Sequence, residues 1–140
     1  MMEKMIALAD LAGQWTLSRR IIDHLAAREG RFIGQCCWLP DAQGLRQEEA
    51  GVLHYADAPP MQAHRSYLWR AEGEGLVVYF DDGRPFHRLV PGQLSDLHAC
   101  DPDLYEVQYD FSQWPDWTQS WRVRGPRKDM TLFSSFQRGG

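Results

Sequence analysis

Residues 13–23 read GQWTLSRRIID, and this stretch decides the fold. Apolar residues alternate with polar ones along it: Trp15, Leu17 and Ile21 stand against Thr16, Ser18 and Arg20. Successive side chains of a strand point to opposite faces of a sheet, so this period of two is typical of a strand with one buried face. The stretch therefore predicts a first β-strand from Gly13 to Asp23.

Similar short segments follow to the end of the chain, separated by turns rich in glycine, proline and aspartate. The further strands are expected at Arg31–Leu39, Leu45–Tyr55, Met61–Arg70, Leu76–Phe80, Phe86–Val90, Ser95–Cys100, Leu104–Phe111, Trp117–Arg124 and Lys128–Phe136. The one helix that the pattern favours is a short one from Glu3 to about Leu11. About ten strands without crossover helices predict an all-β fold with an antiparallel meander.

Such a meander either stacks as a sandwich or closes as an up-and-down β-barrel. Closure removes both sheet edges, and about 8 to 10 strands enclose a cavity that side chains do not completely fill. We therefore expect a single up-and-down β-barrel domain over residues 1–140, with the short helix at its N-terminal end.

The overall composition limits the function classes. The 140 residues are 44% hydrophobic and carry a formal net charge of -4, so the chain can bury a core and has no basic excess for neutralising phosphates. We therefore expect no nucleic-acid partner. We expect no membrane association either, because no stretch approaches the roughly 20 apolar residues needed to span a bilayer. The start does not read as a signal peptide, and three cysteines are an odd number, which together favour a cytoplasmic protein.

The residues Leu11-Ala12-Gly13-Gln14-Trp15 resemble the glycine-x-tryptophan signature of lipocalins and related calycin barrels. The resemblance implies a barrel whose first strand follows a short N-terminal helix. It also implies that a basic residue near the last strand packs over Trp15. Here Arg127, Lys128 and Arg138 are the candidates for that residue.

Three further motifs extend along the chain: Asp82-Gly83-Arg84-x-Phe86-His87, His98-x-Cys100-x-x-Asp103-x-Tyr105 and Gly125-Pro126-Arg127-Lys128. Through these motifs the chain resembles a bacterial and fungal family named domain of unknown function 6314, and the resemblance covers nearly the whole chain. That resemblance supports the fold and marks positions, but it implies no activity, because fold does not determine function.

The turn around Gly83 gathers several polar side chains. Arg84 is suited to bind a carboxylate or phosphate, and His87 belongs to the residue type that exchanges protons near neutral pH. These two residues are candidates for the mouth of a barrel that grips an anionic group. The equally open alternative is a plain hairpin turn in which an aspartate caps backbone donors and pairs with Arg84.

His98 and Cys100 are two positions apart and share one strand face. Together with His87 they could ligate a metal, and together with Asp103 they could form a thiol nucleophile, base and orienting group. The spacing matches no dedicated metal motif, and the two side chains are about 6.6 Å apart along a strand. The alternative is a buried cysteine and a hydrogen-bonded histidine.

Six tryptophans exceed what a core of this size needs, which favours an aromatic wall in a cavity. Trp117 and Trp121 share a strand face and could form that wall, although core packing is the ordinary role of tryptophan. Lys128 lies in the last turn and could close over an anionic ligand, and Tyr105 could donate a hydrogen bond.

The sequence therefore predicts a small-molecule-binding barrel whose ligand is aromatic or anionic. The expected ligand-binding residues are Arg84, His87, His98, Cys100, Tyr105, Trp117, Trp121 and Lys128. An enzyme with His87 and His98 as acid and base is one alternative, and a haem or metal binder is another. Catalytic residues, cofactor, ligand identity and oligomeric state stay open.

Overall fold

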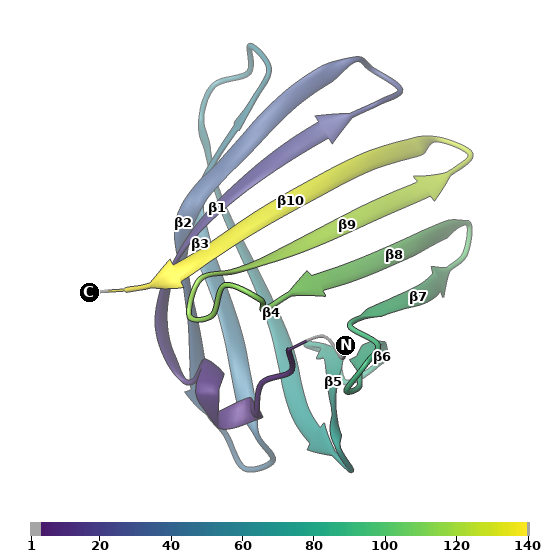
Figure 1. Cartoon of the computed structure of the whole chain (residues 1–140). Coiled ribbons are helices and arrows are strands. Elements are labelled where there is room, and N and C mark those ends of the chain that lie inside the picture. The colour runs from purple at the N-terminus through teal and green to yellow at the C-terminus, as the bar shows by residue number, and fades with distance from the viewer. Residues whose placement is uncertain (1–3, 140) are drawn as a thin grey trace.

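A computed structural model describes residues 4–139. It contains ten antiparallel strands in one sheet, which confirms the predicted all-β meander (Figure 1). The strands are β1 Gly13–Asp23, β2 Arg28–Pro40, β3 Leu45–Tyr55, β4 Met61–Glu72, β5 Gly75–Phe80, β6 Pro85–Leu89, β7 Ser95–Cys100, β8 Asp103–Asp110, β9 Trp117–Gly125 and β10 Lys128–Arg138.

The sheet curls into a nearly closed barrel. Its strand order is β6-β5-β4-β3-β2-β1-β10-β9-β8-β7, so the first and last strands pair with each other and the ends of the order are β6 and β7. No ladder joins these two strands within residues 4–139. Instead, the Asp96 carboxylate of β7 accepts a hydrogen bond from the backbone N–H of Arg88 in β6, at 2.8 Å. A side chain therefore bridges the seam where backbone pairing is missing.

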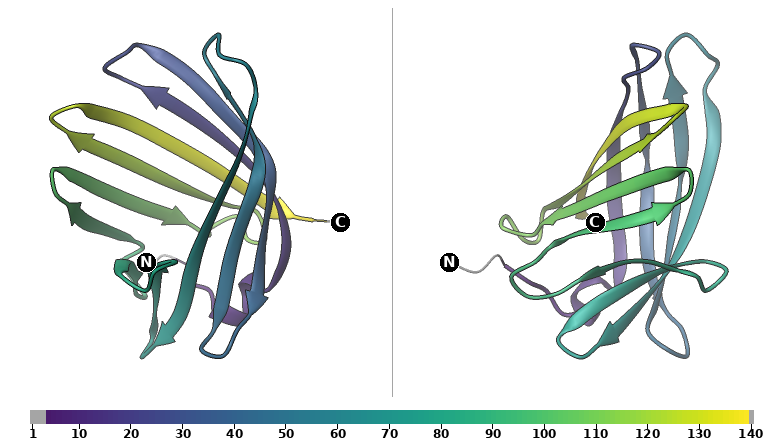
Figure 2. Two further views of the ribbon diagram at one scale, coloured as in Figure 1. Left: turned by 180° about the vertical axis from the view of Figure 1, so that it is seen from behind. Right: turned by 90° about the vertical axis from the view of Figure 1, so that its right-hand side faces the viewer.

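Strands β2 and β3 curve along their length (Figure 2), and their backbones approach closely where two glycines face each other. Gly34 lies directly opposite Gly51 in the ladder. A Cβ atom on Gly34 would lie only 2.2 Å from the carbonyl oxygen of Ala50, and one on Gly51 only 2.3 Å from that of Ile33. This close approach therefore requires residues without side chains at both positions.

The expected N-terminal helix is wrong in its extent and type. Among the described residues, only a 3₁₀ turn, η1 Leu8–Leu11, is present, and residues 4–7 have no helical structure. Glu3, the first residue of the expected helix, lies outside the described residues. The Asp10 carboxylate accepts the backbone N–H of Ala7 at 2.9 Å, which ties the turn at its start, and a segment this short gains little from helical propagation.

This turn closes one end of the barrel over Trp15. The indole N–H of Trp15 donates to the carbonyl of Leu11 at 2.9 Å. The guanidinium of Arg138 stacks over the Trp15 ring, 4.0 Å from its centre, and donates to the carbonyls of Ala12 and Asp10 at 2.8 and 2.5 Å. The predicted basic cover of Trp15 is therefore confirmed, and the residue is Arg138.

Aromatic side chains fill the closed half of the barrel. Trp117 stacks on Phe136 with ring centres 3.9 Å apart, and Trp38 lies 5.8 Å from Trp117 and 5.9 Å from Trp69. All of these rings are buried. This half of the interior is therefore a packed core.

Candidate functional site

The inward faces of the strands become exposed toward the end opposite η1, which we call the mouth. On β4, Trp69 and Tyr67 are buried, whereas the next inward residue, Arg65, is exposed. On β8, Tyr109 and Val107 are buried, whereas Tyr105 is half-buried. The barrel therefore opens to solvent at the beginning of β4 and of β8.

Six rings from six different strands meet at the mouth around Phe86. We call them the aromatic cluster: Tyr67, Phe80, Phe86, His98, Tyr105 and Trp121. The centre of the Phe86 ring lies 4.5 Å from that of Phe80, 5.2 Å from that of Trp121 and 5.4 Å from that of His98. Most of these pairs are edge-to-face, an arrangement that aromatic rings prefer.

A β-bulge explains how Phe86 reaches this position. The register between β5 and β6 shifts between Val78 and Tyr79. Neighbouring residues of a regular strand face opposite ways, yet Phe86 and His87 are both buried. Bulges redirect side chains in this way, and here both residues reach the interior.

Arg65 supplies a positive charge at the mouth. Its guanidinium lies over the Trp121 ring, 5.8 Å from the centre, and no ion pair of Arg65 occurs among residues 4–139. Burial raises the pKa of the neighbouring Tyr67 above its usual value, although Arg65 opposes this, so Tyr67 keeps its proton. The mouth thus combines aromatic rings with an uncompensated cation.

The carboxylate of Glu49, the residue opposite Arg65 in the β3–β4 ladder, is already engaged by another arginine. Both terminal nitrogens of Arg19 donate to the Glu49 oxygens, at 3.0 and 2.8 Å, and both side chains are buried. The Arg19 Nε donates to Ser134 at 2.7 Å, and Gln47 donates to Glu49 at 3.2 Å. Burial lowers the pKa of Arg19, but Glu49 and other neighbours together raise it, so the ion pair is retained.

Only a small space separates this ion pair from the mouth. It measures about 70 Å³, and its lining includes Arg19, Phe32, Glu49, Leu53 and Arg65. Sites for drug-sized ligands are about 300–1,000 Å³. This interior space is therefore too small to hold a drug-sized ligand by itself.

A second buried network involves His87. Its Nε2 lies 2.7 Å from the Tyr109 hydroxyl, and that hydroxyl accepts a hydrogen bond from the Gln119 amide at 2.7 Å. The Tyr109 O–H therefore donates to His87. Burial, and to a lesser degree nearby His98, lowers the pKa of His87 to about 3, so the ring is neutral near pH 7. Its Nδ1 has no hydrogen-bond partner among the described residues.

Four of the residues expected from sequence converge at the aromatic cluster. His98, Tyr105 and Trp121 belong to it, and His87 contacts Phe86 with ring centres 4.4 Å apart. Both histidines thus lie on the inner side of the wall.

The other four expected residues lie elsewhere. Trp117 is part of the packed closed half. Arg84 is exposed in the β5–β6 turn, where it pairs with Asp82 at 2.7 Å and lies over the outer part of the cluster, 5.4 Å from the Phe80 ring centre. Lys128 pairs with Asp103 at 3.5 Å, and the exposed Cys100 lies opposite Asp103 in the ladder, so both flank the rim of the mouth. Residues 4–139 contain no group of three His, Cys, Asp or Glu side chains placed to hold a metal ion.

Sequence reasoning missed Arg19, Glu49 and Arg65. The signal for Arg19 was present, because it occupies the inward position between Leu17 and Ile21 in an otherwise apolar alternation. A charged residue on a buried face requires a partner, but nothing local identifies Glu49 as that partner.

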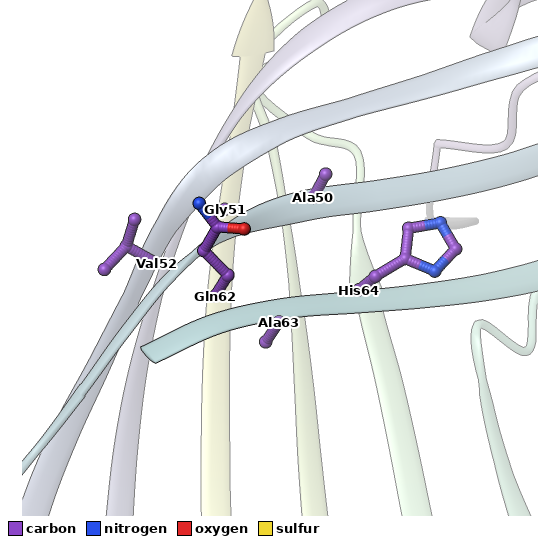
Figure 3. Close-up of a pocket in the computed structure, with 6 residues that line it drawn as sticks. All are labelled: Ala50, Gly51, Val52, Gln62, Ala63 and His64. Atoms are coloured by element: carbon purple, nitrogen blue, oxygen red, sulfur yellow. The ribbon is translucent and has the colours of Figure 1, made fainter. Parts of the chain in front are cut away.

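The outer face of β3 and β4 carries a hollow of about 480 Å³. Figure 3 shows Ala50, Gln62 and His64 on one side of the strands and Ala63 pointing the other way. The His64 ring already pairs with the Glu48 carboxylate, at 2.7 Å. With small side chains and no free charged group along its lining, this hollow is a weaker candidate than the mouth.

The barrel resembles solved structures at 9% sequence identity, which shows the fold alone. One is a protein of unknown function from the DUF3598 family of Nostoc punctiforme, with a TM-score of 0.63 over 99% of this chain and 51% of the other. This chain thus spans about half the length of that protein. The other is the S-type phycobiliprotein lyase CPES of Guillardia theta, with a TM-score of 0.57 over 95% of this chain and 90% of that one.

No curated protein matches the sequence. Within residues 4–139, none of the helical structure is long and apolar enough to cross a membrane. A family model, described as a family of unknown function, matches residues 11–138, which include every strand and the seam-bridging Asp96. The chain belongs to this family, DUF6314.

Proposed function

We propose that the mouth binds a small molecule that has an aromatic body and an anionic group. The observation that carries this proposal is the aromatic cluster beside Arg65, a cation without an ion-pair partner among the described residues. Rings such as Trp121 and Tyr105 offer large flat contact surfaces, and an arginine binds a carboxylate or sulfonate through two parallel hydrogen bonds. Because Glu49 is occupied by Arg19, it does not compete for Arg65.

The ligand would lie against the rings of the aromatic cluster with its anionic group at the Arg65 guanidinium, which is exposed and lies over the Trp121 ring. The structural likeness to the phycobiliprotein lyase supports the proposal only at the level of the fold: it shows that a protein with a named activity is built on a similar barrel.

Binding is favoured over the alternative of acid–base catalysis. A histidine with a pKa near 3 is not in the acidic imidazolium form near neutral pH, and the basic Nε2 of His87 already accepts the Tyr109 hydroxyl. The same hydrogen bond occupies the ring nitrogen that His87 would offer to a haem iron. His98 is left as the one histidine of the cluster that could contact a ligand.

The probe for this site is anilinonaphthalene sulfonate, which is aromatic, anionic and fluorescent when bound. Arg65→Met is expected to weaken its binding about three- to fivefold, equivalent to about 0.6–1 kcal/mol, the usual range for an exposed charge pair. Phenylnaphthylamine, which lacks the sulfonate, should bind both proteins equally. Arg124→Met is the matched control, because Arg124 is an exposed arginine of the outer face, paired with Glu106 at 3.5 Å.

Equal binding of the sulfonate probe to the Arg65→Met variant and to the parent protein would contradict the proposed anion contact. Absence of saturable binding of either probe would contradict the mouth as a ligand site. Near-ultraviolet circular dichroism, which reports on packed tryptophans, establishes that each variant keeps its fold.

A further inference from the structure

A second hollow lies on the outer face of β1, β2 and β3, away from the mouth. It measures about 540 Å³, and its lining includes Ser18, Arg20, Glu29, Arg31 and His54. The neighbours of these residues along the strands, such as Phe32, are buried on the inner face, so Arg20 and Arg31 point outward. The volume falls within the range of small-molecule sites.

Basic residues face each other directly across the strands of this hollow. Arg20 lies opposite Arg31 in the β1–β2 ladder, and Arg31 lies opposite His54 in the β2–β3 ladder. Side chains directly opposite in antiparallel strands are about 4.5–5.5 Å apart at Cβ, and like charges there destabilise the sheet. The free barrel therefore carries a local electrostatic cost at this place.

The carboxylates nearby do not remove that cost. Glu29 pairs with Arg20 at 2.6 Å, but both side chains are more than half exposed, so the pair is weak. No ion pair of Arg31 occurs within residues 4–139. Elsewhere on the outer face, arginines have an acidic partner, as Arg122 does in Asp129 at 2.8 Å. The excess of positive charge is local, since the whole chain has a net charge of -4.

We propose that this hollow binds the phosphate group of a small phosphorylated molecule. A phosphate dianion compensates the unpaired guanidinium of Arg31 and reaches the nitrogens of Arg20 that Glu29 does not engage, since Glu29 accepts from only one of them. Arg31 and Arg20 hold the phosphate from adjacent strands, Ser18 offers a hydroxyl donor, and the remaining volume accommodates the organic part. Binding relieves the repulsion between the arginines, so the site becomes more stable when it is occupied.

Because the two arginines repel each other in the free protein and both bind the phosphate, replacing one should weaken phosphate binding without lowering the stability of the free protein. Arg31→Gln removes one of the two facing charges, so the free variant should melt at the same temperature as the parent protein or slightly higher. Phenyl phosphate at about ten times its dissociation constant should raise the melting temperature of the parent protein by roughly 3–6 °C. In Arg31→Gln most of this rise should be lost.

Three comparisons make the test decisive. If inorganic phosphate raises the melting temperature as much as phenyl phosphate does, the site recognises only the anion. If phenyl phosphate gives the larger rise, the site also holds the organic group. Arg124→Gln, the matched control, should keep the full rise. Arg65→Met should also keep it, so a failure of the mouth site and a failure of this one can be told apart. An equal rise in Arg31→Gln and the parent protein, or no rise with either phosphate at constant ionic strength, would overturn the proposal.

Discussion

Replacing His87 with glutamine should make the stability of the barrel less sensitive to acid. His87 is 4% exposed, and its burial lowers its pKa from about 6.5 to about 3. The unfolded chain therefore binds a proton between these two pH values that the folded chain does not bind. Stability is retained above pH 6.5 and falls as the pH decreases toward 3.

The magnitude follows from the difference between the two pKa values. Each pH unit in the window between about 6.5 and 3 costs about 1.4 kcal/mol, so the parent protein should lose about 2 kcal/mol through His87 between pH 7 and pH 5. In His87→Gln this contribution vanishes, while the glutamine oxygen can still accept the Tyr109 hydroxyl. The variant should therefore lose about 2 kcal/mol less than the parent over the same interval.

The assay is urea unfolding at pH 7 and at pH 5, followed by tryptophan fluorescence. The quantity to compare is the change in unfolding free energy between the two pH values, because a packing defect of the variant is common to both. His24→Gln, which removes an exposed imidazole, is the control for replacing a histidine as such. If parent and His87→Gln lose the same stability on acidification, His87 is not held neutral by burial and the reasoning fails.

Two further predictions concern stability. Arg19→Met leaves the Glu49 carboxylate buried without its partner and should lower the free energy of unfolding by about 3–5 kcal/mol. Arg124→Met removes an exposed pair and should lower it by less than about 1 kcal/mol. Equal losses for the two variants in urea unfolding would contradict the stabilising role of the buried pair. Arg138→Met should lower stability by about 1–2 kcal/mol and change the fluorescence of Trp15, because the cation over the ring and two carbonyl hydrogen bonds are lost. An unchanged melting temperature and spectrum would contradict this second prediction.

The candidate site could be predicted from sequence only in part. His98, Tyr105 and Trp121 are residues that the sequence predicts as ligand-binding, and they lie together at the mouth. Their strands are predictable, and the alternation within each strand places them on one face. Arg65 could not be recognised, because its importance depends on Trp121, which is far away in sequence and approaches only when the sheet closes.

The sequence by itself determined the ten strands and their antiparallel order, because alternation and turn residues are properties of neighbouring positions. It also determined that a basic residue would cover Trp15, through a resemblance that left three candidates. Only the tertiary structure decided that Arg138 is the residue over Trp15. It also decided that Arg19 pairs with Glu49, thirty positions away. A bulge, which the sequence does not reveal, buries both Phe86 and His87. These outcomes depend on distances across a closed sheet, where one shifted register reverses the direction of every later side chain.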